Sequence, residues 1–147
     1  MRRVCKIAAA FLSLVATGVI VFLALMPNPD VGHLHILPRR WSYQLDAHHN
    51  VRHIAGYFGF YLLLVTLGAV AGWLAPLRRR LQLIGGLFLL AASLELAQLL
   101  VPRRSVNFSE VLASWAGVAL AFLVTEGFRL LFNHYRKPAP APDPHVD

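Results

Sequence analysis

Glu95 is the residue whose position most strongly suggests chemistry, because its carboxylate stands inside a long apolar run. A carboxylate within a membrane-spanning helix costs several kcal/mol unless it is paired, protonated or in contact with water. Gln98 follows three residues later, and this spacing places both side chains on one face of a helix. The sequence therefore predicts a polar site around Glu95 and Gln98.

Further polar side chains stand at the ends of the neighbouring apolar runs. His53 and Tyr57 are one helical turn apart at the start of one run, and Glu110 stands at the start of another. Arg103 and Arg104 lie in the polar segment between the run that contains Glu95 and the run that follows Glu110. Guanidinium groups bind phosphate and carboxylate through paired, charge-assisted hydrogen bonds. The predicted binding site consists of His53, Tyr57, Glu95, Gln98, Arg103, Arg104 and Glu110.

We expect this site to bind an anionic headgroup on the outer side of a membrane. Arg103 and Arg104 would hold the anion, Glu95 and Gln98 would orient the two arginines, and the other three residues would line the rim. Two alternatives fit the same residues. In the first, the site belongs to an enzyme that acts on a lipid-linked phosphate, with His53 or Glu95 as the acid–base catalyst. In the second, the polar residues only clamp the helices of a structural subunit.

Four apolar runs must position these residues. The chain of 147 residues is 57% hydrophobic, with a mean hydropathy of +0.57. Its apolar residues gather in runs at about 7–26, 54–74, 81–101 and 111–132. A helix of about 20 residues spans the roughly 30 Å hydrocarbon layer of a bilayer. The sequence thus predicts an all-α integral membrane bundle of four helices over residues 7–132, with no soluble domain of any size.

The distribution of basic residues predicts the orientation of this bundle. Nine Lys and Arg side chains flank the membrane on the side of both chain ends and of the turn near residue 80, against five on the other side. The more basic side of a membrane protein is cytoplasmic. We therefore expect a cytoplasmic basic segment at 1–6, outer loops at 27–50 and 102–109, and a disordered, proline-rich cytoplasmic tail at 133–147.

Other classes of function have little support in the sequence. The net charge of +7 arises at the ends of the apolar runs, where it fits anionic lipid rather than nucleic acid. His49 and His53 have a spacing that suits a metal ion, but no third ligand follows at a convincing distance. We expect no nucleic-acid partner, no metal and no cofactor.

The spacing of the polar residues resembles that of the VanZ-like family. The matching pattern is Glu95-x2-Gln98-x3-Pro102-x-Arg104-x5-Glu110-x6-Gly117, preceded by His53-x3-Tyr57, and it covers about residues 46–124. The resemblance implies a small multi-pass protein of the bacterial inner membrane, with a role in the cell envelope. The family is named for a member associated with teicoplanin resistance, so an effect on glycopeptide tolerance is implied as well. A lipid-linked cell-wall precursor is then the expected ligand, beside the membrane lipids.

The sequence departs from the family pattern at five positions. Arg103 replaces a glycine, Glu110 replaces an aspartate, and Ser114 replaces an asparagine. His49 and Asn50 stand where the family has Asp-Lys. The Glu95, Gln98 and Arg104 centre of the pattern is intact.

Overall fold

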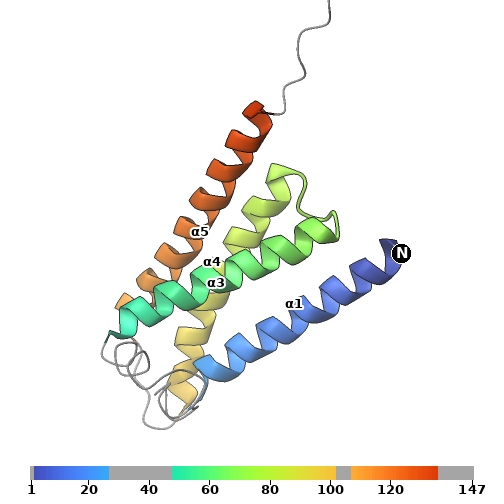
Figure 1. The fold of residues 1–147 in the computed structure, drawn as a ribbon. Helices are drawn as coiled ribbons and strands as arrows, with labels where there is room; N and C mark the ends of the chain where they lie inside the picture. Colours follow the sequence, from blue (N-terminus) through green and yellow to red (C-terminus); the bar gives the residue numbers. More distant parts are fainter. Residues whose placement is uncertain (1, 27–47, 102–106, 136–147) are drawn as a thin grey trace, which may run out of the picture.

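The computed structural model describes residues 2–26, 48–101 and 107–135. All regular secondary structure in these residues is helical (Figure 1). The α-helices are α1 (Arg2–Ala24), α3 (His49–Val70), α4 (Leu77–Ala97) and α5 (Phe108–Tyr135), and the 3₁₀ helix η2 (Gln98–Leu100) continues α4. The described residues form no strand. The predicted all-α bundle of four helices is confirmed.

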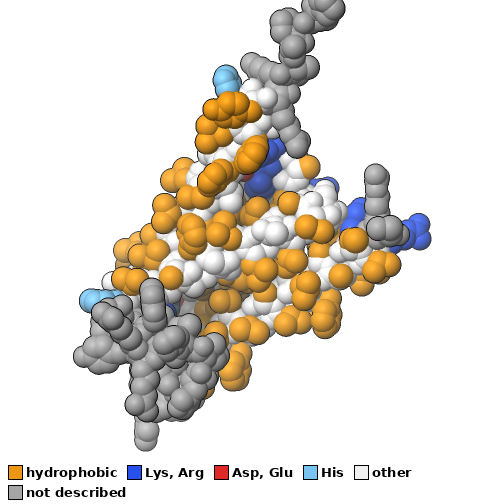
Figure 2. All heavy atoms as spheres, in the orientation of Figure 1, with side chains coloured by type: hydrophobic (Ala, Val, Ile, Leu, Met, Phe, Trp, Pro, Cys, Tyr) orange, Lys and Arg blue, Asp and Glu red, His pale blue; other side chains and the backbone are white. Residues whose placement is uncertain are grey.

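Each of the four α-helices is long and apolar enough to cross a membrane. Large apolar side chains such as Phe11, Leu89 and Leu123 remain exposed, and Figure 2 shows hydrophobic side chains spread along the sides of the helices. Exposed apolar surface of this extent is unfavourable in water but is matched by the lipid tails of a bilayer. The chain is therefore a multi-pass membrane protein.

The helices do not begin and end with the apolar runs. The predicted first span begins at residue 7, whereas α1 begins at Arg2 and includes the basic residues that precede the run. The predicted tail begins at residue 133, whereas α5 continues to Tyr135. Charged residues mark where a helix leaves the hydrocarbon layer, not where its backbone hydrogen bonds stop. The remainder of the predicted tail and residues 27–47 of the predicted outer loop lie outside the described residues.

A tight turn joins α3 to α4 and ends α3 earlier than the apolar run does. The Trp73 N–H donates to the Gly68 carbonyl at 2.8 Å, and the Gly72 N–H donates to the Ala69 carbonyl at 3.0 Å. Gly72 has a φ of +72°, which glycine adopts without strain. This pattern is a Schellman motif, which satisfies the last carbonyl groups of a helix. The turn reverses the direction of the chain between α3 and α4, and both helices pack against α5.

The core lies between α3, α4 and α5. Its buried side chains are Tyr57, Phe60 and Tyr61 of α3, Leu87 and Ala91 of α4, and Val118 and Ala121 of α5. α3 and α5 share the most extensive contact, and α1 lies along α3 at the edge of the bundle (Figure 1). Among the α1 side chains that the structure describes, only Ala9 is buried.

Gly117 allows α3 and α5 to approach closely. A Cβ atom at this position would overlap the backbone carbonyl oxygen of Ile54 and lie 3.1 Å from its carbonyl carbon. Small residues at such crossings let helices pack where lipid provides no hydrophobic driving force. We call the end of the bundle where α3 begins, α4 ends and α5 begins the His53 end, and the opposite end the Arg80 end.

Candidate functional site

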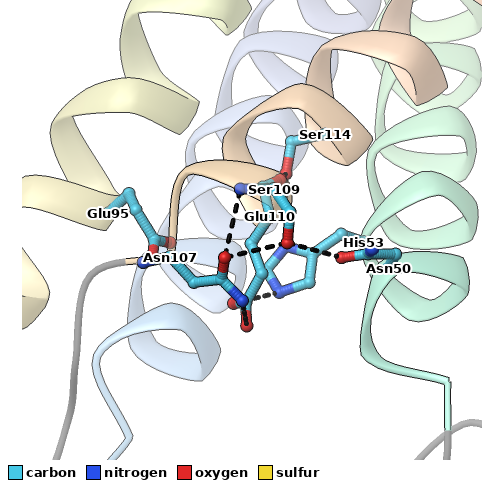
Figure 3. A network of polar contacts seen from close by, with 7 residues as sticks. All are labelled: Asn50, His53, Glu95, Asn107, Ser109, Glu110 and Ser114. Carbon is cyan, nitrogen blue, oxygen red and sulfur yellow. Dashed lines mark hydrogen bonds and ion pairs between the residues drawn. The ribbon is translucent and has the colours of Figure 1, made fainter.

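Polar side chains from three helices converge at the His53 end (Figure 3). α3 contributes Asn50 and His53, α4 contributes Glu95, and the start of α5 contributes the remaining members. The members from the start of α5 are Asn107, Ser109, Glu110 and Ser114. The site is thus formed by segments that lie far apart in the sequence.

Asn107 precedes α5 and caps its first turn. Its side-chain Oδ1 accepts a hydrogen bond from the Ser109 N–H at 3.1 Å, and its Nδ2 donates to Glu110 Oε1 at 3.4 Å. An asparagine before a helix and a glutamate three residues later have the spacing of a capping box, in which side chains satisfy the first N–H groups of a helix. In the usual box the glutamate accepts from the backbone N–H of the capping residue. Here that N–H donates to another residue.

The acceptor for the Asn107 N–H is Glu95 of α4. The distance from the Asn107 nitrogen to Glu95 Oε1 is 2.7 Å, and the Glu95 side chain is buried, with 4% of its surface exposed. A carboxylate is favourable at the start of a helix because the peptide dipoles leave partial positive charge there. Glu95 therefore ties the end of α4 to the start of α5.

His53 lies between two groups of α5. Its Nε2 is 2.9 Å from Glu110 Oε2, and its Nδ1 is 3.2 Å from Ser114 Oγ. The Ser114 hydroxyl donates to the Glu110 backbone carbonyl at 2.8 Å, and Ser114 is 2% exposed. These contacts fix the imidazole ring between α3 and α5, one turn from the Gly117 crossing.

Tyr57 and Gln98 complete the described part of the predicted site. Tyr57 follows His53 by one helical turn and is buried in the core, rather than at the rim. Gln98 is the first residue of η2, which continues α4 three residues after Glu95, and its side chain is buried, with 2% exposed. Five predicted residues therefore come together at the His53 end: His53, Tyr57, Glu95, Gln98 and Glu110.

Arg103 and Arg104 lie outside the described residues. The predicted pairing of either arginine with Glu95 therefore remains a prediction. Both arginines precede Asn107 in the sequence, with two residues between Arg104 and Asn107.

Four further residues of the cluster were not predicted as site residues: Asn50, Asn107, Ser109 and Ser114. Asn107 and Glu110 carry a signal in the sequence, because an asparagine three residues before a glutamate at the start of an apolar run is typical of a capping box. Ser109 contacts Asn50 Oδ1 at 3.3 Å and Asn107 Oδ1 at 2.8 Å. We find no sequence pattern that would have indicated the Asn50 contact.

The geometry of the described residues limits the chemistry of this site. Serine, histidine and glutamate are together, but the Ser114 hydroxyl is buried and donates to a carbonyl group, so it is not presented to a substrate as a nucleophile. Among the residues that the structure describes, no three His, Cys, Asp or Glu side chains gather as metal ligands would. The arrangement is suited to holding polar groups in fixed positions.

A second polar cluster lies at the Arg80 end. The sequence predicts a surface ion pair of small value between Glu126 and Arg129, and these side chains are 3.8 Å apart. The closer partner of Glu126 is Arg80 of α4, with 2.6 Å between Nε and Oε1. Arg80 is 6% exposed and also donates from Nη1 to the Leu74 and Ala75 carbonyls at 2.9 and 2.7 Å. The main ion pair of Glu126 is therefore the largely buried contact with Arg80 between α4 and α5, and not the predicted surface pair with Arg129.

No protein-family model, curated protein or solved structure matches this chain.

Proposed function

We propose that this chain is a VanZ-like protein of the bacterial inner membrane whose His53 end faces outward and binds an anionic headgroup. The observation that carries the proposal is the convergence of polar side chains from α3, α4 and α5 at one end of an otherwise apolar bundle. In a membrane protein, ionisable residues at such a place are functional candidates because their burial is costly.

The charge distribution of the described helices supports an outward-facing His53 end. Of the Lys and Arg residues that the structure describes, one lies at the His53 end, and it is Arg52. The Arg80 end and the start of α1 carry Arg3, Lys6, Arg78, Arg79, Arg80 and Arg129. Since cytoplasmic ends are enriched in basic residues, the Arg80 end is proposed to be cytoplasmic.

The proposed ligand is an anionic lipid-linked or cell-wall headgroup held by Arg103 and Arg104. Both arginines directly precede the segment at Asn107 that Glu95 anchors through its hydrogen bond of 2.7 Å. The resemblance to the VanZ-like family implies a ligand from the cell envelope and an effect on glycopeptide tolerance.

The test compares lipids that co-purify with the wild-type protein and with the double variant Arg103→Lys, Arg104→Lys. Lysine keeps the charge but cannot reproduce the bidentate geometry of a guanidinium group. We expect mass spectrometry to find an anionic envelope lipid with the wild type and at least a tenfold loss in the double variant. The matched control is Arg78→Lys, Arg79→Lys at the other end, which should retain the lipid.

A structural role is the second candidate, and one observation favours it. The described polar groups bond mainly to one another, as in the contacts of Glu95 with Asn107 and of His53 with Glu110. A helix clamp would need no ligand. If Arg103→Lys, Arg104→Lys is stable, retains the same lipids as the wild type and restores glycopeptide tolerance to a deletion strain, the clamp is the correct function and the headgroup site is refuted.

A further inference from the structure

One acidic side chain at the Arg80 end has two basic partners. Of the Asp and Glu residues that the structure describes, only Glu126 lies at this end, and its carboxylate faces the guanidinium groups of Arg80 and Arg129. We call these three side chains the Glu126 triad. With one negative and two positive charges, the triad has a net charge of +1.

Arg80 engages both oxygens of the Glu126 carboxylate. Its Nε lies 2.6 Å from Oε1, and its Nη2 donates to Oε2 at 3.3 Å. Its Nη1 donates to the Leu74 and Ala75 carbonyl groups, and its side chain is buried. The negative charge of Glu126 is thus matched within the protein by Arg80.

Arg129 is left with an incomplete partner. Over the described ranges its one ionic contact is the distance of 3.8 Å from its Nη1 to Glu126 Oε2, an oxygen that Arg80 already engages. The Arg129 side chain is 44% exposed, and an exposed ion pair of this length contributes little. Since a guanidinium group has several N–H donors, Arg129 can offer donors and a positive charge to a ligand.

The position of Arg129 along α5 matches the level of lipid headgroups. At about 1.5 Å per residue, α5 rises about 29 Å from Glu110 to Arg129, which is close to the roughly 30 Å thickness of the hydrocarbon layer. When Glu110 of the His53 end stands at one boundary of this layer, Arg129 stands at the other. Lipid phosphate groups lie at that boundary, where they attract basic side chains.

Exposed apolar side chains surround Arg129 on α5. Phe128 precedes it and Phe132 follows one turn later, with 60% and 65% of their surfaces exposed, and Leu131 is exposed as well. Figure 2 shows basic side chains between the last turns of α5 and the start of α4, bordered by hydrophobic side chains. A ligand that matches this surface has an anionic group for the arginine and apolar chains for its neighbours.

We propose that Arg129 is the centre of a binding site for one anionic phospholipid, in the leaflet at the Arg80 end. The phosphodiester group of the lipid accepts hydrogen bonds from the Arg129 guanidinium group, and the acyl chains lie along Phe128 and Phe132. The single negative charge of the lipid neutralises the Glu126 triad. This site differs from the proposed headgroup site at the His53 end in its residues and in its ligand.

Native mass spectrometry of the full chain, released from detergent micelles after titration with phosphatidylglycerol or phosphatidylcholine, tests the proposal. The choline group carries a positive charge that cancels the charge of its phosphate. We expect the wild type to bind the first phosphatidylglycerol about tenfold more tightly than phosphatidylcholine, the size of effect that one charged hydrogen bond gives. Equal affinities for the two lipids would overturn the proposal without any substitution.

Substitutions at Arg129 then locate the site. Arg129→Gln should weaken the binding of phosphatidylglycerol about tenfold and leave that of phosphatidylcholine unchanged. Arg129→Lys should retain most of the affinity, because it keeps the positive charge that binds the phosphate. The matched control is Arg78→Gln, an exposed arginine at the same end that lies outside the triad, and it should bind like the wild type.

Two further results would overturn the proposal. Equal losses in Arg129→Gln and Arg78→Gln would show that the basic end attracts lipid without a defined site. Displacement of phosphatidylglycerol by inorganic phosphate at the same concentration would show an anion site in which the acyl chains have no part. The variant Arg103→Lys, Arg104→Lys should bind phosphatidylglycerol like the wild type, so failure of this proposal and failure of the proposed headgroup function are distinguishable.

Discussion

Asn107 is the single residue that connects the end of α4 to the start of α5. Its backbone N–H donates to Glu95, and its side chain accepts from the Ser109 N–H and donates to Glu110. The residue is neutral and lies outside the apolar runs, so a search for ionisable groups inside those runs does not find it. The cap itself spans only a few residues and can be recognised from the sequence. Its partner Glu95 lies on another helix, and this contact can be seen only in the folded structure.

Removal of the Glu95 carboxylate should destabilise the protein. In Glu95→Ala the Asn107 N–H loses its charged acceptor, and a hydrogen bond to a charged group contributes about 1.5–3 kcal/mol. Glu95→Gln keeps an acceptor oxygen and should cost less. The measurement is the thermal unfolding of detergent-solubilised protein, followed by circular dichroism.

Leu96→Ala is the matched control for this series, since Leu96 is the next residue of α4 and is exposed. It should unfold near the temperature of the wild type. Equal unfolding temperatures for Glu95→Ala, Glu95→Gln and the wild type would show that the contact with Asn107 contributes nothing to stability.

The bundle's helices were largely predictable at the level of elements, whereas their ends were not. Four charge-poor runs are long enough to cross a bilayer, and each lies within or overlaps one helix. The end of α3 at Val70 depends on the left-handed conformation of Gly72, which hydropathy does not record. The close packing of α5 against α3 depends on Gly117. A single glycine in an apolar run occurs for several reasons, so the sequence alone does not predict this helix crossing.

Gly117→Ala should push α3 and α5 apart. The added methyl group would meet the Ile54 backbone, which cannot move aside as a flexible side chain does. Overpacking of this kind costs typically about 1–3 kcal/mol. Gly127→Ala, on the same helix, has open space around the new methyl group and should be neutral or stabilising by up to about 1 kcal/mol. Unfolding in a denaturing detergent measures both, and equal stability of the two variants would contradict the close crossing.

Arg80→Lys should weaken the connection between the α3–α4 turn and α5. Lysine keeps the charge near Glu126 but cannot also donate to the Leu74 and Ala75 carbonyls in the arginine geometry. Hydrogen bonds of charged groups contribute about 1.5–3 kcal/mol each, so we expect a lower unfolding temperature. Arg78→Lys, at an exposed position two residues earlier, is the control.

A double-mutant cycle of Arg80→Lys with Glu126→Gln tests the ion pair itself. Its coupling energy should be well above zero, and additive changes in the free energy of unfolding would refute the buried pair.

The whole molecule has two chemically different ends, and the excess of Lys and Arg at the Arg80 end predicts that this end is cytoplasmic. We therefore expect a cytoplasmic N-terminus and a cytoplasmic C-terminus. Reporter fusions after residues 45 and 137 test this orientation. We expect a periplasmic signal from the first fusion and a cytoplasmic signal from the second. A cytoplasmic signal at residue 45 would reverse the bundle and would place the His53 end inside the cell.

The peripheral position of α1 has a consequence for how the protein assembles. Each helix satisfies its own backbone in the bilayer, so insertion and association are separate steps. α1 contacts its neighbours through a narrow strip in which Ala9 is buried and Ala16 and Ile20 pack against the core, while α3, α4 and α5 share the core and both polar clusters. Three helices can therefore form a complete assembly unit, onto which α1 docks as the last and most weakly held part. When the chain is supplied as two co-expressed fragments divided between Met26 and His48, the larger fragment should fold alone and capture the smaller one within the membrane.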